Sequence, residues 1–458
     1  MKYLLYLVFT TTILLAQQPI HVQEFNKHRS VVVVDDADVV TSGSIVSALN
    51  KRVFGYYPYW AEQNAYTQLD YSALTHIGFF SADIDTSGSI KLMGATRILP
   101  LASAAHQNNV KVLLVATSFG YANNDILFSD SLKSKRVISQ LVKTVLQYQL
   151  DGVNVDAELV RTAQKTNMVR FMGWLRDSLR AVNTSYELSM ATPAVDWSNA
   201  FNFPQLSSLC DYLILMGYDY YYSGSPTAGP VAPLQGEAYS VTRSVQTYLQ
   251  AGVKKEKLLL GVPWYGYEWA TKDTLRKSVR DSSRAAGKSY TFFTCERRSQ
   301  QGKRYDAATS SIWYLLYDST GYYQGWFDDS VTLGEKYALV NSQNIGGIGI
   351  WALTYQASDG RLWSGIKQAF QTSVSVGEIT KNKQSPLLLI TNTTLILNSI
   401  ETGTLVELYD IAGNRIYNRI CTDGTHTIEL PQIVSGIYVC TFRQPKGIVT
   451  TQMLYVYN

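Results

Sequence analysis

Short apolar segments rich in β-branched residues recur along most of this chain, and longer segments with helical spacing of apolar residues separate them. Strands that alternate with helices pack as a parallel sheet, and eight such units close into a barrel. The pattern therefore predicts an α/β fold, a (β/α)8 TIM barrel. The predicted strands are residues 52–57, 75–80, 110–115, 152–158, 187–191, 211–216, 257–262 and 346–351.

The spacing of the segments also predicts how the chain is divided. The gap between the seventh and eighth strands, about residues 265–345, is too long for one loop and one helix, and residues 290–293 and 312–317 within it have strand character. We therefore predict an inserted unit at about residues 266–325, a long loop being the alternative. We predict that residues 51–372 form the barrel, that residues 373–386 form a polar linker, and that residues 387–458 form a small β-sandwich.

The N-terminus has the features of a secretory signal. Lys2 precedes an apolar run that continues to Ala16, near which we predict cleavage, and residues 17–50 are interpreted as a leader onto the barrel. The run ends at Gln17, too early for a transmembrane helix, which needs about 20 apolar residues. The sequence therefore predicts a secreted or cell-surface protein without an integral membrane segment.

Composition narrows the ligand class. The formal net charge is +4 and no long run of Lys or Arg occurs, so nucleic acid is not an expected partner. The chain has 32 Tyr and 9 Trp, and aromatic faces stack on sugar rings, so this count favours a glycan ligand, although core packing also accounts for it. The five histidines show no ligand spacing and no Gly-rich phosphate loop occurs, so we expect no metal and no cofactor.

Four cysteines allow three pairings, and the sequence does not choose among them. A Cys421–Cys440 disulfide within the C-terminal unit and four free thiols are both open.

The fourth predicted strand carries an unusual polar face. Side chains alternate along a strand, so Asn154, Asp156 and Glu158 share one face while the intervening apolar residues share the other. Burying such a row requires hydrogen bonds or a shared proton, because each ionised carboxylate loses hydration. The row is a candidate catalytic site, and a buried salt-bridge network or a calcium site is the alternative.

Residues 151–158, Asp-Gly-Val-Asn-Val-Asp-Ala-Glu, resemble the Asp-Gly-x-Asp-x-Asp-x-Glu signature of glycoside hydrolase family 18, the chitinases and their relatives. The resemblance extends over roughly residues 52–370 and places Glu158 on the catalytic acid. Asn154 stands where most chitinases have Asp, and Ala157 where they have an aromatic residue. The Asn form resembles the branch of spore-coat and cortex glycosidases, and the insertion resembles the α+β unit that forms one wall of the cleft in this family.

The resemblance implies a role for each site residue. In this family the N-acetyl oxygen of the substrate is the nucleophile, so one acid suffices. Glu158 is then the general acid and later the base, and Asp156 polarises the N-acetyl N–H. We further expect the Asn154 amide to donate to Asp156 and keep it ionised. The remaining assignments are the Tyr218 hydroxyl on the acetamido oxygen, Met216 in the acetyl pocket, Asp219 on the sugar or Glu158, Trp351 beneath the cleaved sugar, and Tyr56, Trp264, Trp60, Trp197 and Tyr265 as subsite walls.

These residues imply an exported hydrolase of β-1,4-linked N-acetylglucosamine polymers, chitin or chito-oligosaccharides, that retains anomeric configuration. The alternative substrate is peptidoglycan or an N-glycan core, favoured by Asn154 and by residues 266–269 and 325–329, which resemble the spore-glycosidase branch. The alternative of another class is a non-catalytic glycan-binding lectin.

The C-terminal unit has a resemblance of its own. Residues 408–415, 428–431 and 435–439 resemble the C-terminal sorting domain of the type IX secretion system, although the last strand, residues 452–456, has no Lys where one is common. This implies the secretion machinery as a partner. The alternative is an accessory carbohydrate-binding sandwich, which usually displays a row of Trp or Tyr, and residues 387–458 contain no Trp.

Overall fold

In the computed structural model, residues 18–31, 49–300 and 302–371 are described, together with residues 387–390, 394–397, 401–410, 414–422, 427–430, 433, 436–445 and 449–456 of the C-terminal part. The chain divides into two compact units, residues 1–372 and 373–458. The predicted signal, its cleavage near Ala16 and the linker at 373–386 lie outside the described residues.

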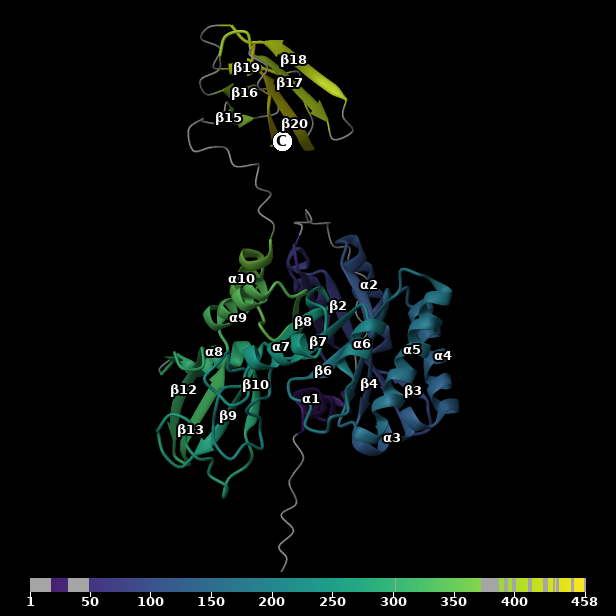
Figure 1. The fold of residues 1–458 in the computed structure, drawn as a ribbon. Helices are drawn as coiled ribbons and strands as arrows, with labels where there is room; N and C mark the ends of the chain where they lie inside the picture. The colour runs from purple at the N-terminus through teal and green to yellow at the C-terminus, as the bar shows by residue number, and fades with distance from the viewer. Residues whose placement is uncertain are drawn as a thin grey trace, which may run out of the picture. The chain divides into compact units, whose positions relative to one another are not determined.

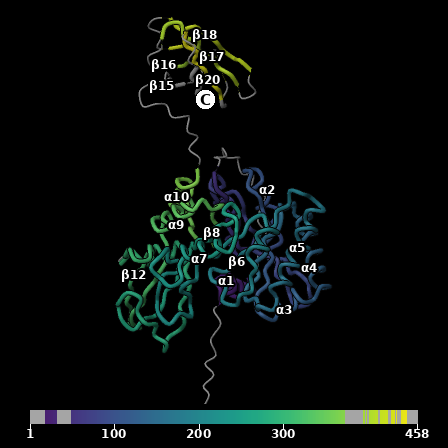
Figure 2. Tube along the Cα trace, in the orientation of Figure 1, coloured from purple at the N-terminus to yellow at the C-terminus, as the bar shows by residue number. Residues whose placement is uncertain are grey.

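The first unit contains a closed parallel barrel, as predicted (Figures 1 and 2). The sheet runs β1-β14-β8-β7-β6-β5-β4-β2, and parallel pairing of β1 with β2 closes it. A short strand, β3 (Ile90–Leu92), extends β2 in antiparallel register. The barrel strands are β1 (Arg52–Pro58), β2 (His76–Ile84), β4 (Lys111–Phe119), β5 (Gly152–Glu158), β6 (Glu187–Pro193), β7 (Tyr212–Met216), β8 (Leu258–Pro263) and β14 (Gly347–Trp351).

Glycine is required where β5 begins. Gly152 has a φ of +152°, and a Cβ there would lie 2.0 Å from the carbonyl oxygen of Glu187 on β6. A side chain would push the two strands apart. The close approach sets the register in which Asn154 pairs with Ser189.

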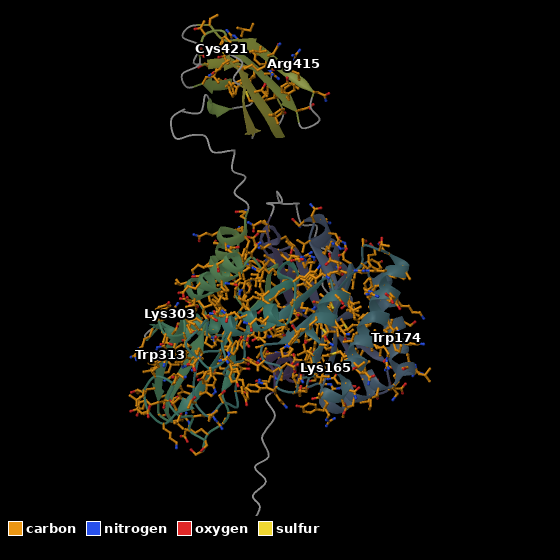
Figure 3. All side chains as sticks on the ribbon, viewed as in Figure 1. Lys165, Trp174, Lys303, Trp313, Arg415 and Cys421 are labelled. Atoms are coloured by element: carbon orange, nitrogen blue, oxygen red, sulfur yellow. The ribbon has the colours of Figure 1, made fainter. Side chains whose placement is uncertain are left out.

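Amphipathic helices cover the barrel. On α5 the apolar residues recur every three or four positions, so they form one stripe that packs inward. Trp174 of the same helix is partly buried and lies within 5.3 Å of the cationic groups of Lys135 and Arg170 (Figure 3). The helices are α2 (Ile98–Gln107), α3 (Tyr121–Ser129), α4 (Ser131–Gln147), α5 (Lys165–Val182), α6 (Phe203–Leu209), α7 (Val241–Gln250), α9 (Ser330–Gln343) and α10 (Arg361–Phe370).

Helix ends are fixed by capping side chains. Asp130 accepts hydrogen bonds from the first-turn N–H groups of Leu132 and Lys133 at the start of α4. Asp329 and Thr332 form a reciprocal capping box at the start of α9. Each such cap stabilises a helix by about 1 kcal/mol.

The insertion between β8 and β14 is a five-stranded antiparallel sheet with one helix, α8 (Phe292–Ser299). The sequence predicted a strand over residues 290–293, but this strand ends at Thr291, whose side chain caps α8 by accepting from the N–H of Thr294. Glu268 holds the helix against the sheet, because it accepts two hydrogen bonds from Arg298 and one from Tyr314. The strands are β9 (Tyr265–Thr271), β10 (Lys288–Thr291), β11 (Arg304–Asp306), β12 (Ser311–Asp318) and β13 (Gly321–Phe327).

The second unit consists of two small sheets around one apolar core, as expected of a β-sandwich. Arg415 pairs with Glu407 at 2.9 Å (Figure 3). Cys421 and Cys440 are buried free thiols, as are Cys210 and Cys295 in the first unit. One sheet holds β15 (Leu387–Ile390), β16 (Thr394–Leu397) and β19 (Thr427–Glu429); the other holds β17 (Leu405–Asp410), β18 (Arg415–Ile420), β20 (Gly436–Arg443) and β21 (Val449–Val456).

A helix that the sequence did not predict, α1 (Ile20–His28), lies within the predicted leader. Figure 1 shows it in purple, and its contacts include Asp156 on β5, which lies far away in the sequence. In the described part of the chain, no helix combines the length and apolarity that crossing a bilayer requires.

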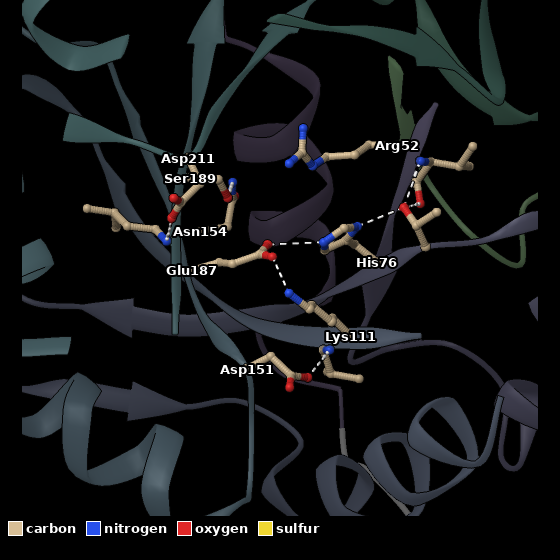
Figure 4. A network of polar contacts seen from close by, with 12 residues as sticks. Arg52, His76, Lys111, Asp151, Asn154, Glu187, Ser189 and Asp211 are labelled. Carbon is tan, nitrogen blue, oxygen red and sulfur yellow. Dashed lines mark hydrogen bonds and ion pairs between the residues drawn. The ribbon is translucent and has the colours of Figure 1, made fainter. Parts of the chain in front are cut away.

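A charged network closes the amino-terminal end of the barrel (Figure 4). Glu187, at the start of β6, lies 3.0 Å from His76 Nε2 on β2 and bonds Lys111 on β4. Burial alone would raise the pKa of Glu187, but His76 and Lys111 outweigh it and lower this pKa to about 2. Residues at this end of a TIM barrel serve stability rather than chemistry.

We therefore expect Glu187→Gln to lower the free energy of unfolding at pH 7 by about 2 kcal/mol, because it removes the charged contacts with His76, which is buried, and with Lys111, whose side chain is 45% exposed. The stabilising contribution of a carboxylate with a depressed pKa is present above its ordinary pKa of 4.5 and is lost as the pH falls toward 2. Urea unfolding at several pH values checks this. The difference from the native chain should shrink below pH 4.5, and the exposed control Glu62→Gln should match the native chain throughout.

Candidate active site

The carboxyl end of β5 carries the predicted polar row into the barrel. Asn154 and Asp156 are fully buried and Glu158 is 4% exposed. They lie on the inner face because the strand alternates and its other face packs under the helices. The structure thus places three polar side chains in succession along one wall of the barrel mouth.

The deepest member of the row is held by two neighbouring strands. The Tyr56 hydroxyl on β1 donates to Asn154 Oδ1 at 3.2 Å, and Asn154 Nδ2 donates to Ser189 Oγ on β6 at 2.9 Å. The expectation that the Asn154 amide donates to Asp156 is therefore wrong. The cause is the register of β6, which places a hydroxyl acceptor beside residue 154.

The residues after β7 converge on the same place. Met216 is the last residue of β7 and is buried, and Tyr218 and Asp219 follow it. Asp219 bonds the Tyr265 hydroxyl of β9, and its other oxygen accepts from the main-chain N–H of Ile20 at 2.7 Å. Burial raises the pKa of Asp219 to about 6, although these two hydrogen bonds oppose the shift.

The centre of the site contains a histidine that the sequence did not identify. His21 Nδ1 lies 2.7 Å from Asp156 Oδ2 and 3.1 Å from Glu158 Oε1, and Nε2 lies 2.8 Å from the Tyr218 hydroxyl. Its ring centroid is 3.8 Å from that of Trp351, the last residue of β14. The imidazole therefore occupies the point toward which the predicted catalytic side chains are directed.

The charges of the site depend on one another. Burial and the charge of Asp156 raise the pKa of Glu158 to about 8, although His21 opposes the shift. Burial lowers the pKa of His21, but the two carboxylates outweigh it and raise this pKa to about 10. Such an environment keeps a proton available on Glu158 near neutral pH, as a general acid requires.

The predicted subsite aromatics do not all reach this point. Tyr56 lies 5.4 Å from the His21 ring, and Trp60 stacks on His28 of α1. The ring of Trp264 contacts neither His21 nor His28. It packs edge-on to the ring of Trp363 on α10 at a centroid distance of 4.9 Å, and the main-chain N–H of Trp264 donates to the carbonyl of Trp351. Trp197 lies at the surface, 67% exposed, beside Tyr239.

Among the described residues, His21, Asp156 and Glu158 bring three metal-ligating atoms within 4.8 Å of one another. Their separations of 2.7 and 3.1 Å are hydrogen-bond lengths, so a proton on His21 Nδ1 shared by the two carboxylates accounts for the contact.

Comparison with known proteins adds the family context. The model of "Glycosyl hydrolases family 18" matches residues 52–356. A putative sporulation-specific glycosylase, YdhD, of Bacillus subtilis is 24% identical over 290 residues, 60% of this chain and 63% of that protein. The cortical fragment-lytic enzyme of Bacillus anthracis is 23% identical over 297 residues, which are 61% of this chain and 65% of that protein. The matches thus span less than two thirds of these relatives.

Solved structures show the same fold. A family 18 N-acetylglucosaminidase from Paenibacillus barengoltzii superposes with a TM-score of 0.62 and 19% identity, covering 70% of this chain and 100% of that one. A family 18 chitinase from Cycas revoluta in complex with (GlcNAc)3 superposes with a TM-score of 0.63 and 19% identity. The match covers 70% of this chain and 99% of that one.

Proposed function

We propose that this chain, which belongs to the glycosyl hydrolases of family 18, hydrolyses glycans with β-1,4-linked N-acetylglucosamine through substrate-assisted retaining catalysis. The observation that carries the proposal is the convergence of Asp156, Glu158 and Tyr218 on one buried point above Trp351. An N-acetylated sugar at this point would meet an acid, a carboxylate acceptor, a hydroxyl donor and an aromatic floor.

The chemistry divides into two steps. In the first, Glu158 gives its proton to the leaving glycosidic oxygen while the acetamido oxygen attacks the anomeric carbon and the glycosidic bond breaks. Asp156 accepts the acetamido N–H, and the Tyr218 hydroxyl orients the acetamido oxygen. In the second, water attacks the anomeric carbon, Glu158 takes its proton, and the oxazolinium ring opens with net retention.

Two unpartnered oxygen atoms support these roles. Asp156 Oδ1 and Glu158 Oε2 have no hydrogen-bond partner among the described residues, although both are buried. A buried carboxylate oxygen without a donor is costly, so Asp156 Oδ1 is suited to a ligand that donates, such as an amide N–H. No protein group in the described part of the chain competes with a ligand for the proton of the acid at Glu158 Oε2.

Peptidoglycan is the second candidate substrate. The similarity to cortical fragment-lytic enzymes and the presence of Asn154 in place of the usual Asp support this alternative. A non-catalytic lectin is disfavoured, since such a protein has no need for a buried Glu158 beside Asp156 and Tyr218.

Digestion of chito-oligosaccharides and purified peptidoglycan side by side, with products identified by mass, tests the proposal and separates the two substrates. Because His21 occupies the point that the sugar would take, the native chain and His21→Ala should be assayed in parallel. Cleavage of neither glycan by either protein would contradict a hydrolase.

For the second unit we propose export and sorting. The barrel and the sandwich each have a separate apolar core, so truncation after about Ser385 should leave the activity of the barrel unchanged while its export to the cell surface or medium fails. Activity assays and cell fractionation measure the two effects. A truncated protein that is exported but no longer binds glycan would instead identify a carbohydrate-binding module.

A further inference from the structure

Helix α1 is docked in the barrel mouth by contacts along its length. At its start, the N–H of Ile20 donates to Asp219. In the next turn, Gln23 Nε2 donates to the Tyr267 hydroxyl at 3.0 Å. Ile20 is 1% exposed, so the helix is packed like a core element.

The second half of α1 is anchored as firmly. Glu24 is 5% exposed and accepts from Ser289 of β10 at 2.7 Å and from Tyr355, after β14, at 3.2 Å. Phe25 is 3% exposed and packs edge-on to three aromatic rings, those of Tyr59, Phe80 and Phe119. The contacts come from barrel and insertion alike, so docking requires the assembled site.

His21 is the residue of α1 that contacts the proposed catalytic side chains. Both ring nitrogens bond proposed catalytic groups, and the imidazole plane is inclined by 33° to the indole of Trp351 at a centroid distance of 3.8 Å. The residue is fully buried. A sugar ring and this imidazole cannot share the same volume, because protein interiors are close-packed.

We propose that residues 18–31 are an autoinhibitory plug, a segment of the chain that competes with glycan for the site and keeps the protein latent until the segment is removed or displaced. The inference rests on the proposed function for the identity of the competing ligand. The predicted cleavage near Ala16 would leave the plug on the exported protein.

Covalent attachment makes the plug effective. The helix ends at His28 and β1 begins at Arg52, so the segment is tethered near the site at an effective concentration of about mM. A plug that is docked in about 90% of molecules reduces the apparent affinity for substrate about tenfold. Proteolysis between α1 and the barrel removes this tether and converts the plug into a dilute peptide.

The test compares four proteins: chain 17–458, chain 49–458, and chain 17–458 with His21→Ala or with Asn26→Ala. Asn26 lies on the exposed face of the same helix and is the matched control. We expect kcat/KM on a soluble chito-oligosaccharide to rise at least about tenfold on truncation and on His21→Ala, and to stay unchanged for Asn26→Ala. Equal kcat/KM for chains 17–458 and 49–458 would overturn the plug. If the truncated chain does not fold, His21→Ala decides.

A second measurement needs no catalysis. A synthetic peptide of residues 18–31 should bind chain 49–458 in calorimetry and inhibit it competitively, and the peptide with His21→Ala should bind at least about tenfold more weakly. Binding without hydrolysis by any form would retain the plug and reject the glycosidase. Hydrolysis that is indifferent to the peptide, with no binding, would retain the glycosidase and reject the plug.

Peptide binding should also depend on pH. The pKa of docked His21 is above its ordinary value of 6.5, so docking takes up a proton, is strongest below pH 6.5 and weakens as the pH rises toward 10. A Kd that does not increase between pH 6 and pH 9 would contradict the shared proton at Nδ1. The titratable groups that face His21 are Asp156, Glu158, Tyr218, Tyr56 and Asp219.

Discussion

Glu158→Gln is expected to reduce kcat by about 10²–10⁴-fold without loss of folding, which is the usual contribution of a general acid. The amide has the same shape and can still accept from His21, but it has no proton to give to a leaving oxygen. The raised pKa of Glu158, caused first by burial and then by the charge of Asp156, supplies that proton near neutral pH in the native chain.

The measurement should use both chain 17–458 and chain 49–458, so that the plug does not hide the effect. The control is Glu335→Gln on α9, whose carboxylate bonds the Tyr305 hydroxyl at 2.9 Å on the protein surface. Circular dichroism and thermal unfolding check folding. Turnover of Glu158→Gln close to that of the native chain would exclude Glu158 as the acid.

The barrel was predictable because its signal is local and repeated. Each strand is indicated by a short apolar run in the sequence. In a parallel barrel, the carboxyl ends of all strands lie at the same end of the barrel. For that reason the ends of β5, β7 and β14, and with them Glu158, Tyr218 and Trp351, are brought together as the sequence pattern indicated.

Helix α1 was not predictable in the same way. It has nine residues, too few to be stable alone, and its stability comes from partners that lie far away in sequence: Asp156 is 135 residues from His21, and Asp219 is 199 residues from Ile20. The donor preference of Asn154 was missed for a related reason, since it depends on Ser189 of a neighbouring strand. A weak signal existed in Ile20, Val22 and Phe25, three closely spaced apolar residues that the helix buries.

The second large effect is expected from the substrate. If the acetamido oxygen is the nucleophile, a glucosamine or glucose oligomer of the same length should be cleaved at least about 10⁴-fold more slowly, because a well-oriented intramolecular nucleophile is equivalent to an effective concentration of about 10⁵–10⁸ M. No other carboxylate takes the place of this nucleophile in the proposed mechanism, since Asp156 is assigned to the acetamido N–H. Chemical re-acetylation of the glucosamine oligomer should restore cleavage.

Two further observations make this expectation specific to the site. Tyr218→Phe should lower kcat by about 10²-fold on the acetylated oligomer, a loss comparable with removal of one oxyanion donor, because the hydroxyl now bonded to His21 Nε2 would no longer orient the acetamido oxygen.

A thiazoline analogue of the cyclic intermediate should bind chain 49–458 more tightly than the substrate does. It should also bind chain 49–458 more tightly than chain 17–458, in which His21 competes for the same volume. Efficient hydrolysis of the unacetylated oligomers would reject the substrate-assisted mechanism and require a protein nucleophile, for which Asp156 would be the first candidate.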